Sequence, residues 1–248
     1  CGEYGPGRMA EPETICEGIL DFFRKSTVKP LTGRKVLVTA GPTHEPIDPV
    51  RFIANHSSGK QGYAIASALA DLGAEVVLVS GPTRLDAPRG VTRHDVMSAK
   101  EMLAACEAVL PVDAAIFAAA VADWRVATES GHKIKKQDGK LPELTLAENP
   151  DILATVSALD AGRPSLIIGF AAETEKVVEN GQAKLARKGC DWIVANDVGT
   201  GTGTFGGDDN RVFLLTKDDV EDWPKQSKEL VARTLVERIA TYFQGVKA

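Results

Sequence analysis

Polar and glycine residues gather where the apolar runs of this sequence end. Gly41 and Thr43 follow the run KVLVTA, and residues 55–62, NHSSGKQG, precede a segment with helical periodicity. Glycines and hydroxyls before a helix expose backbone N–H groups that bind anions. The segment matches no standard motif, because a P-loop needs Ser or Thr after GK and Lys60 is followed by Gln61. Phosphate binding and a tight structural turn both remain open for this segment.

A second group of candidate residues ends the run AAIFAAA. Small side chains at residues 118–122 let a ligand lie against the backbone, and Asp123 can then meet a ligand hydroxyl or a metal ion. The alternative is a close-packed strand with a helix-capping aspartate. Further along, Phe170 in GFAAET either stacks on a ring or fills the core, and the segment AND (195–197) is another polar strand end.

Lysines form a third group. Lys133 and Lys135 flank Ile134 in an expected strand, so their side chains would share one face and could neutralise a polyphosphate. A solvated edge strand protected by lysine is the alternative. Lys184 and Lys188 are four residues apart and lie on one helix face, which either contacts a ligand or faces solvent.

The elements that must position these groups alternate between strand and helix. Apolar runs predict buried strands at residues 35–40, 75–80, 114–120, 165–171, 192–195 and 211–216. Helical periodicity predicts helices at residues 62–72, 98–109, from 149, 174–187 and 228–243. We therefore expect an α/β fold, a Rossmann-like and mostly parallel sheet flanked by helices. Residues 133–136 and 144–146 predict an added β-hairpin arm. Since parallel strands end at one sheet edge, the polar groups predict one nucleotide-sized site.

Composition narrows the class of protein. The 248 residues carry a net charge of -5, which disfavours a nucleic-acid partner. The sequence has no run of 18 apolar residues that would predict a membrane span, and it has no signal peptide pattern. We therefore expect a cytoplasmic protein. The chain begins at Cys1 without Met, which predicts a piece of a longer protein. Four scattered cysteines predict neither a zinc site nor a disulfide framework.

Six motifs together are more specific than any one of them. They are TAGPTHEPIDPVRFIANHSSGKQGYAIA (39–66), AAAVADWR (118–125), KIKK (133–136), ENPDIL (148–153), GFAAET (169–174) and AND (195–197). In this order they resemble the signature of phosphopantothenate–cysteine ligases, over about residues 33–245. The opening CGEYGPGRM resembles the substrate-clamp loop of flavin-dependent phosphopantothenoylcysteine decarboxylases, in which a cysteine matching Cys1 acts as an acid.

The two resemblances imply a domain organisation. Bacteria commonly fuse the two activities in this order. Residues 1–30 would then be a remnant of a decarboxylase domain with a linker, and residues 31–248 a ligase domain. Because the flavin-binding body of the decarboxylase family is absent, the resemblance implies no FMN and no decarboxylation. It also implies a homodimer.

The ligase resemblance implies a two-step reaction in coenzyme A biosynthesis. The carboxylate of 4′-phosphopantothenate attacks CTP to give an acyl-cytidylate and pyrophosphate, and L-cysteine then displaces CMP. Mg²⁺ would hold the triphosphate. Asn55 would act on the acyl-cytidylate, and Lys133 would stabilise the first transition state.

Other roles carry over from the family by position. The resemblance implies CTP contacts from Phe117, Ala118, Ala119, Asp123, Lys133, Asn149, Pro150, Asp151, Ile152, Phe170, Lys184 and Lys188. It implies substrate contacts from Gly41, Thr43, Asn55, Ser57, Ser58 and Gly59, and Asp123 is the candidate metal ligand.

Two other classes of function stay as alternatives. A nicotinamide-dependent reductase fits the Rossmann-like first half, but GxGxxG and a YxxxK pair are both missing from the sequence. A non-catalytic phosphate-binding module would use the same polar strand ends without chemistry.

Overall fold

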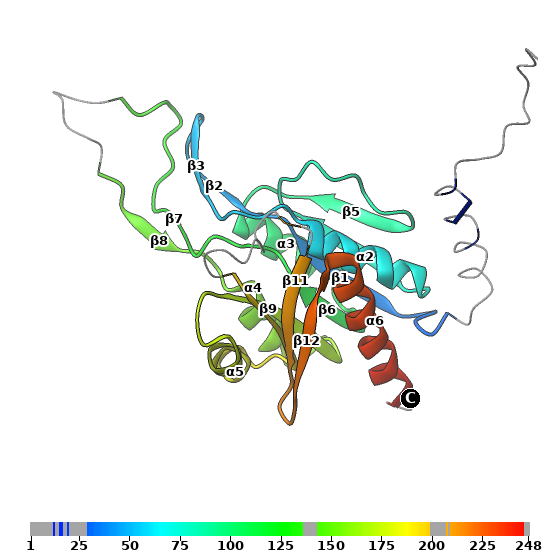
Figure 1. Cartoon of the computed structure of the whole chain (residues 1–248). Coiled ribbons are helices and arrows are strands. Elements are labelled where there is room, and N and C mark those ends of the chain that lie inside the picture. Colours follow the sequence, from blue (N-terminus) through cyan, green and yellow to red (C-terminus); the bar gives the residue numbers. More distant parts are fainter. Residues whose placement is uncertain are drawn as a thin grey trace, which may run out of the picture.

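The computed structural model describes residues 29–135, 143–198, 207 and 209–245, together with residues 12, 15, 16 and 19. Residues 12–25, whose apolar spacing predicts a short helix, lie largely outside the described residues. So do Cys1 and most of residues 199–209, whose glycine-rich sequence predicts a loop. The described part contains an eight-stranded sheet with helices on both faces (Figure 1). The expected α/β fold with a mostly parallel sheet is confirmed.

The elements have the following bounds. The main sheet contains β1 (Lys35–Ala40), β4 (Glu75–Ser80), β5 (Val91–Asp95), β6 (Ala114–Phe117), β9 (Leu166–Glu173), β10 (Trp192–Asp197), β11 (Asp209–Leu215) and β12 (Val220–Ser227). The helices are α2 (Lys60–Asp71), α3 (Ala99–Val109), α4 (Ile152–Ser157), α5 (Val177–Lys188) and α6 (Lys228–Gly245). Two small antiparallel pairs, β2 (His44–Asp48) with β3 (Arg51–Ala54) and β7 (Trp124–Val126) with β8 (Leu146–Glu148), lie outside the main sheet.

The strand order of the main sheet creates a crevice. The order is β12-β11-β10-β9-β6-β1-β4-β5, parallel from β10 to β5 and antiparallel at β11 and β12. The chain leaves β1 toward β4 on one side and later returns to β6 on the other side. Open α/β sheets bind ligands where two such neighbouring strands diverge, outside their carboxyl ends. The fold therefore places the expected site between β1 and β6.

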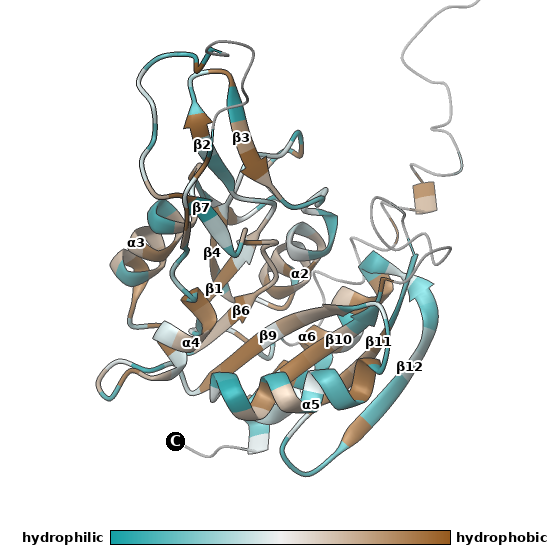
Figure 2. Cartoon of the chain, turned by 90° about the vertical axis from the view of Figure 1, so that its left-hand side faces the viewer, coloured by the Kyte–Doolittle hydropathy of each residue, from teal (hydrophilic) through white to brown (hydrophobic). Residues whose placement is uncertain are grey.

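Both faces of the sheet are buried, which explains the continuous apolar runs. Along β1, Val36, Val38 and Ala40 pack in the core under α2 and α6, whereas Leu37 packs in the opposite core with α3, α4 and α5. Successive side chains of a strand point to opposite faces, so a strand covered on both sides must be apolar at every position. Figure 2 shows these inner strands as mostly hydrophobic and β12 as mostly hydrophilic.

The arm differs from its expected form. Its strands are β7 and β8, with β2 and β3 beside them, and the four project from one side of the sheet (Figures 1 and 2). Residues 133–135 belong to no strand. The expected alternation of Lys133 and Lys135 on one face of a strand is therefore wrong, because the ladder partner of β8 is β7 instead.

Four further strands lie where the sequence predicts none. They are β2, β3, β5 and β12. β12 is polar and contains Pro224, and both features are tolerated at a sheet edge. Within the described ranges, no helix is long and apolar enough to cross a membrane.

Candidate functional site

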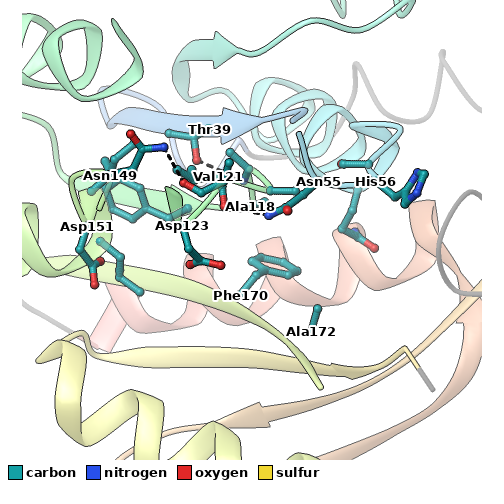
Figure 3. Close-up of a pocket in the computed structure, with 18 of the residues that line it drawn as sticks. Thr39, Asn55, His56, Ala118, Val121, Asp123, Asn149, Asp151, Phe170 and Ala172 are labelled. Atoms are coloured by element: carbon teal, nitrogen blue, oxygen red, sulfur yellow. Dashed lines mark hydrogen bonds between the residues drawn. The ribbon is translucent and has the colours of Figure 1, made fainter. Parts of the chain in front are cut away.

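A cleft of about 810 Å³ opens at the carboxyl ends of β1 and β6. Its lining consists of Thr39, residues 55–58, Gln61, residues 117–124, residues 148–153, Phe170, Ala172, Lys184, Lys188, Asn196, Asn210 and Lys228. In Figure 3, Asp151 lies at one end of the cleft and His56 and Ala172 lie at the other, with Asp123 and Phe170 between them. The position agrees with the crevice that the strand order creates.

The floor of the cleft is a backbone segment held beside the end of β1. The N–H of Ala120 donates to the carbonyl of Gly41 at 2.9 Å, and the N–H of Ala122 donates to the hydroxyl of Thr43 at 3.0 Å. Thr39 accepts from the N–H of Ala119 through its hydroxyl, at 3.3 Å. These bonds extend the pairing of β6 with β1 beyond the strand ends. The small side chains of the segment leave its backbone open to a ligand.

Two asparagines complete the floor from outside the sheet. The side-chain amide of Asn55 donates to the carbonyl of Val121 at 2.9 Å, and that of Asn149 donates to the carbonyl of Ala122 at 2.8 Å. The N–H of Asn149 also donates to the carbonyl of Asp123 at 2.9 Å. The two amides thereby fix the direction in which the segment leaves β6, and they satisfy carbonyls that no ladder partner reaches.

One end of the cleft carries a charged cluster from α4 and α5. Asp151 caps α4 by accepting from the N–H of Ala154 at 3.0 Å, and it forms an ion pair with Lys188. Burial raises the pKa of Asp151, but the hydrogen bonds from Lys188 and Ala154 outweigh burial and hold the pKa below its usual value. Lys184 donates to the carbonyl of Phe170 at 2.7 Å. Burial, and then the charge of Lys188, lower the pKa of Lys184.

Most of the residues expected to contact a ligand do line this cleft. They are Asn55, Ser57, Ser58, Phe117, Ala118, Ala119, Asp123, Asn149, Pro150, Asp151, Ile152, Phe170, Lys184 and Lys188. Their individual roles stay predictions. Gly41, Thr43 and Gly59 lie behind the lining. Thr43 is fully buried, and its hydroxyl accepts from the N–H of Ala122. Gly41 and Gly59 adopt positive φ angles in tight turns.

Lys133 lies apart from the cleft, in the arm. Its neighbour Ile134 donates its N–H to the buried carboxylate of Asp48 at 3.1 Å and accepts from the guanidinium of Arg51 at 3.0 Å. The carboxylate of Asp48 also accepts from the N–H groups of Val50 and Arg51 and pairs with the Arg51 guanidinium. Its pKa is therefore held far below the usual value, chiefly by Arg51. This Asp48 contact anchors the segment that carries Lys133.

Sequence reasoning missed two residues at the second end of the cleft. Asn210 of β11 and Lys228 of α6 line this end together with Gln61 of α2, which lies in the candidate segment 55–62. No local pattern marks Asn210 or Lys228, because each is a single polar residue at the start of an element. Only the order of the strands brings them beside α2.

Metal binding has little support among side chains that the structure describes. In those ranges, no three His, Cys, Asp or Glu side chains gather into a group that could hold a metal ion. Asp123, the candidate metal ligand, therefore has no such group around it there.

Comparison with known proteins gives the family. A family described as the DNA/pantothenate metabolism flavoprotein C-terminal domain matches residues 31–243. The chain is 48% identical to the coenzyme A biosynthesis bifunctional protein CoaBC of Escherichia coli strain K12, over 98% of this chain and 60% of that protein. It thus spans about three fifths of the length of this curated relative.

Solved structures agree with this family. The crystal structure of the C-terminal domain of a coenzyme A biosynthesis bifunctional protein CoaBC has a TM-score of 0.74 and 41% identity, covering 88% of this chain and 99% of that chain. The DNA/pantothenate metabolism flavoprotein from Streptococcus pneumoniae has a TM-score of 0.71 and 26% identity, covering 85% of this chain and 100% of that chain.

The matching family and the Streptococcus pneumoniae relative are both described as flavoproteins, which contradicts several expectations drawn from the ligase resemblance. On this finding, the expected CTP-dependent phosphopantothenate–cysteine ligase activity and the expected nucleotide-binding role are wrong. The expected cofactors, Mg²⁺ and CTP without FMN, are wrong on the same finding. So are the expected partners, which were 4′-phosphopantothenate, L-cysteine and CTP. The division of the chain at residue 30 and the cytoplasmic location stay predictions.

The family description implies a flavin, and the cleft has features that fit a group of that size and charge. Residues 118–122 line the floor with small side chains, and Lys184 and Lys188 bring positive charge to one end of the cleft. When bound, a flavin supplies redox chemistry; the residues of this chain would supply only its floor and its charges. The extent of the family match decides the classification. The chain belongs to the family described as the DNA/pantothenate metabolism flavoprotein C-terminal domain and is a relative of the coenzyme A biosynthesis bifunctional proteins.

Proposed function

We propose that this chain binds phosphopantothenoylcysteine in the cleft, as part of a coenzyme A biosynthesis enzyme. The observation that carries the proposal is the distribution of charge, with lysines at both ends of one elongated cleft. Lys184 and Lys188 lie at one end and Lys228 at the other. Phosphopantothenoylcysteine is a long, flexible molecule with a phosphate at one end and a carboxylate at the other, so both of its charged ends find cations.

The floor between the two ends suits the middle of such a ligand. Residues 118–122 present backbone groups behind small side chains, and the ligand has two amide groups along its chain. Phe170 and Ile152 add apolar surface for its methyl and methylene groups. Small-molecule sites generally combine such apolar walls with a few placed polar groups.

Isothermal titration calorimetry with the purified chain tests the proposal. We expect saturable binding of phosphopantothenoylcysteine at one site and clearly weaker binding by the Lys184→Met variant. Lys225→Met, an exposed change of the same charge on β12, is the matched control and should bind as the parent does. A folded parent that does not bind the compound would refute the proposal.

A second measurement addresses the flavoprotein description of the family. FMN is added to the same protein with phosphopantothenoylcysteine, and the mass of the recovered compound is measured by mass spectrometry with and without FMN. A mass loss equal to carbon dioxide that occurs only with FMN would show that this chain catalyses flavin-dependent decarboxylation. Binding without any change in mass would restrict its role to holding the compound.

A further inference from the structure

The end of the cleft opposite Asp151 contains buried polar groups that no contact in the described residues explains. The side-chain oxygens of Gln61 and Asn210 are buried and have no hydrogen-bond partner among the described residues. Asn210 is 3% exposed and Lys228 is 6% exposed, yet both line the cleft. A buried acceptor without a donor is unfavourable, so such an atom needs an explanation, and a donor group of a bound ligand is one.

Two helix N-termini meet at this end. The side-chain amide of Gln61, in the first turn of α2, donates to the backbone carbonyl of Lys228 at 3.1 Å, and Lys228 is the first residue of α6. The N-cap of α2 is Gly59, which provides no side-chain cap. Each helix N-terminus carries a partial positive charge and outward N–H groups. The ammonium of Lys228 adds a full charge, and it donates to the carbonyl of Gly207 at 2.5 Å.

The strands place this end away from the charged cluster of Asp151, Lys184 and Lys188. Ala172 of β9 is in register with Asn196 of β10, and β11 with Asn210 comes next in the sheet. Asn196 and the serines at positions 57 and 58 add neutral polar groups to the lining. Positive charge from three sources therefore meets two buried acceptor oxygens at this end of the cleft.

We propose that Lys228, Asn210, Gln61 and the N-terminus of α2 form a subsite for a phosphate monoester whose carbon chain carries a hydroxyl near the phosphate. The cation and the helix N–H groups match the phosphate oxygens. The side-chain oxygens of Asn210 and Gln61 are acceptors, and the neighbouring hydroxyl can donate its proton to one of them. The subsite rests on the proposed function and orients the ligand in it: the phosphate lies at Lys228 and the carboxylate lies at Lys184.

Two sources of this chemistry are possible, and matched ligand pairs separate them. Phosphopantothenoylcysteine is compared with pantothenoylcysteine, and FMN is compared with riboflavin, which carries the same hydroxyls without the phosphate. Dissociation constants are measured by calorimetry for the parent, Lys228→Met, Asn210→Asp and the exposed control Lys225→Met. The ratio within each pair reports on the phosphate alone, so a general loss of stability cancels.

We expect the parent to prefer the phosphorylated compound of one pair by about tenfold or more, as for a charge-assisted contact. Lys228→Met and Asn210→Asp should bring that ratio close to one, and Lys225→Met should keep it. The pair that shows the effect identifies the source of the phosphate. Asn210→Asp is nearly isosteric, so it remains informative if Lys228→Met fails to fold.

Two outcomes would overturn the inference in different ways. If the parent binds phosphorylated and dephosphorylated compounds equally, or if both variants keep the preference, the subsite is wrong while the proposed function stands. If the folded parent binds none of the four compounds, the subsite and the proposed function both fall.

Discussion

The side-chain amide of Asn55 lies 2.9 Å from the backbone carbonyl of Val121, 66 residues further along the chain. This contact joins the end of the β2–β3 pair to the floor of the cleft. Asn55 is itself exposed, so losing its hydrogen bond should disturb the floor of the cleft more than the stability of the core.

We predict that Asn55→Asp weakens binding of phosphopantothenoylcysteine with little loss of global stability. The variant removes the donor and places a carboxylate beside the Val121 carbonyl, which repels it. We expect an affinity loss of about tenfold and a change in unfolding free energy of about 1 kcal/mol or less. Calorimetry and urea unfolding measure the two quantities. Equal affinity in the variant and the parent would show that the floor holds its shape without this bond.

Asp48 offers a test of the arm. We predict that Asp48→Asn speeds hydrogen exchange at the Ile134 amide, because the carboxylate that accepts from it would become a weaker acceptor without charge. The exposed Asp160→Asn is the control. Exchange at Ile134 that is the same in all three proteins would mean that other contacts hold the segment of Lys133.

The same residue predicts a response to acid. The pKa of Asp48 is lowered in the folded protein, chiefly by Arg51, from an ordinary value of 3.8. A group with a lowered pKa stabilises the folded state above its unfolded pKa, and that stabilisation is lost as the pH falls through the folded pKa. Exchange at Ile134 in the parent should therefore accelerate relative to other amides below about pH 4. A constant ratio down to pH 2 would contradict this role.

Lys184 predicts how ligand affinity changes at alkaline pH. Burial, followed by the charge of Lys188, lowers its pKa below the ordinary 10.5, so it loses its charge earlier than an exposed lysine as the pH rises. Affinity for an anionic ligand should fall as the pH approaches 10, and the fall should be smaller in Lys184→Met. Calorimetry across this range measures it. Identical pH profiles for the parent and Lys184→Met would assign the effect to another group.

The parts of this site that sequence could predict are those that depend on local pattern. β1 was predictable because Val36, Leu37 and Val38 are all buried, on alternate faces. Asp151 and Lys188 were found as candidates, although their ion pair depends on how α4 packs against α5. The placement of a strand end and of a helix terminus follows from periodicity and turn residues, whereas many individual lining residues, Asp151 among them, were expected only from the family resemblance.

The parts that sequence could not predict depend on contacts between distant elements. Pro46 lies within β2, and a proline in a short polar run favours a loop unless a partner strand such as β3 is known. The sequence predicts a strand at Lys133, but Lys133 lies in no strand, and β8 pairs with β7 instead. Asn210 lines the same cleft as Gln61 only because β11 lies antiparallel to β10, and no spacing along the chain reveals that pairing.

Gly62 tests how closely α2 must approach β1. A Cβ atom at this position would lie 2.5 Å from the Cβ of Ala40 and 3.2 Å from the carbonyl oxygen of Thr39. We predict that Gly62→Ala lowers the free energy of unfolding by about 1–3 kcal/mol, since the helix must move away from the strand. Gly131→Ala, where nothing lies within 4 Å of the new atom, should cost far less. Urea unfolding that gives equal costs would mean that α2 shifts freely.

The buried thiols predict where reactive cysteine chemistry can occur. Burial, followed by the charge of Glu107, raises the pKa of Cys106 to about 12, and burial raises that of Cys190 to about 11. Neither residue lines the cleft. The thiolate is the reactive form, so both cysteines should resist alkylation by iodoacetamide at pH 8 in the folded protein, whereas the exposed Cys16 should react.

Peptide mass mapping after timed alkylation measures the three rates, and the urea-unfolded chain is the control. In urea, Cys106 and Cys190 should react as fast as Cys16, because their protection comes from burial and not from the neighbouring sequence. If Cys106 or Cys190 reacted rapidly in the folded chain, its thiol would reach solvent and would become a candidate for the chemistry of this protein. Protection of both would leave any chemistry in the described part of the cleft to the side chains and backbone groups that line it.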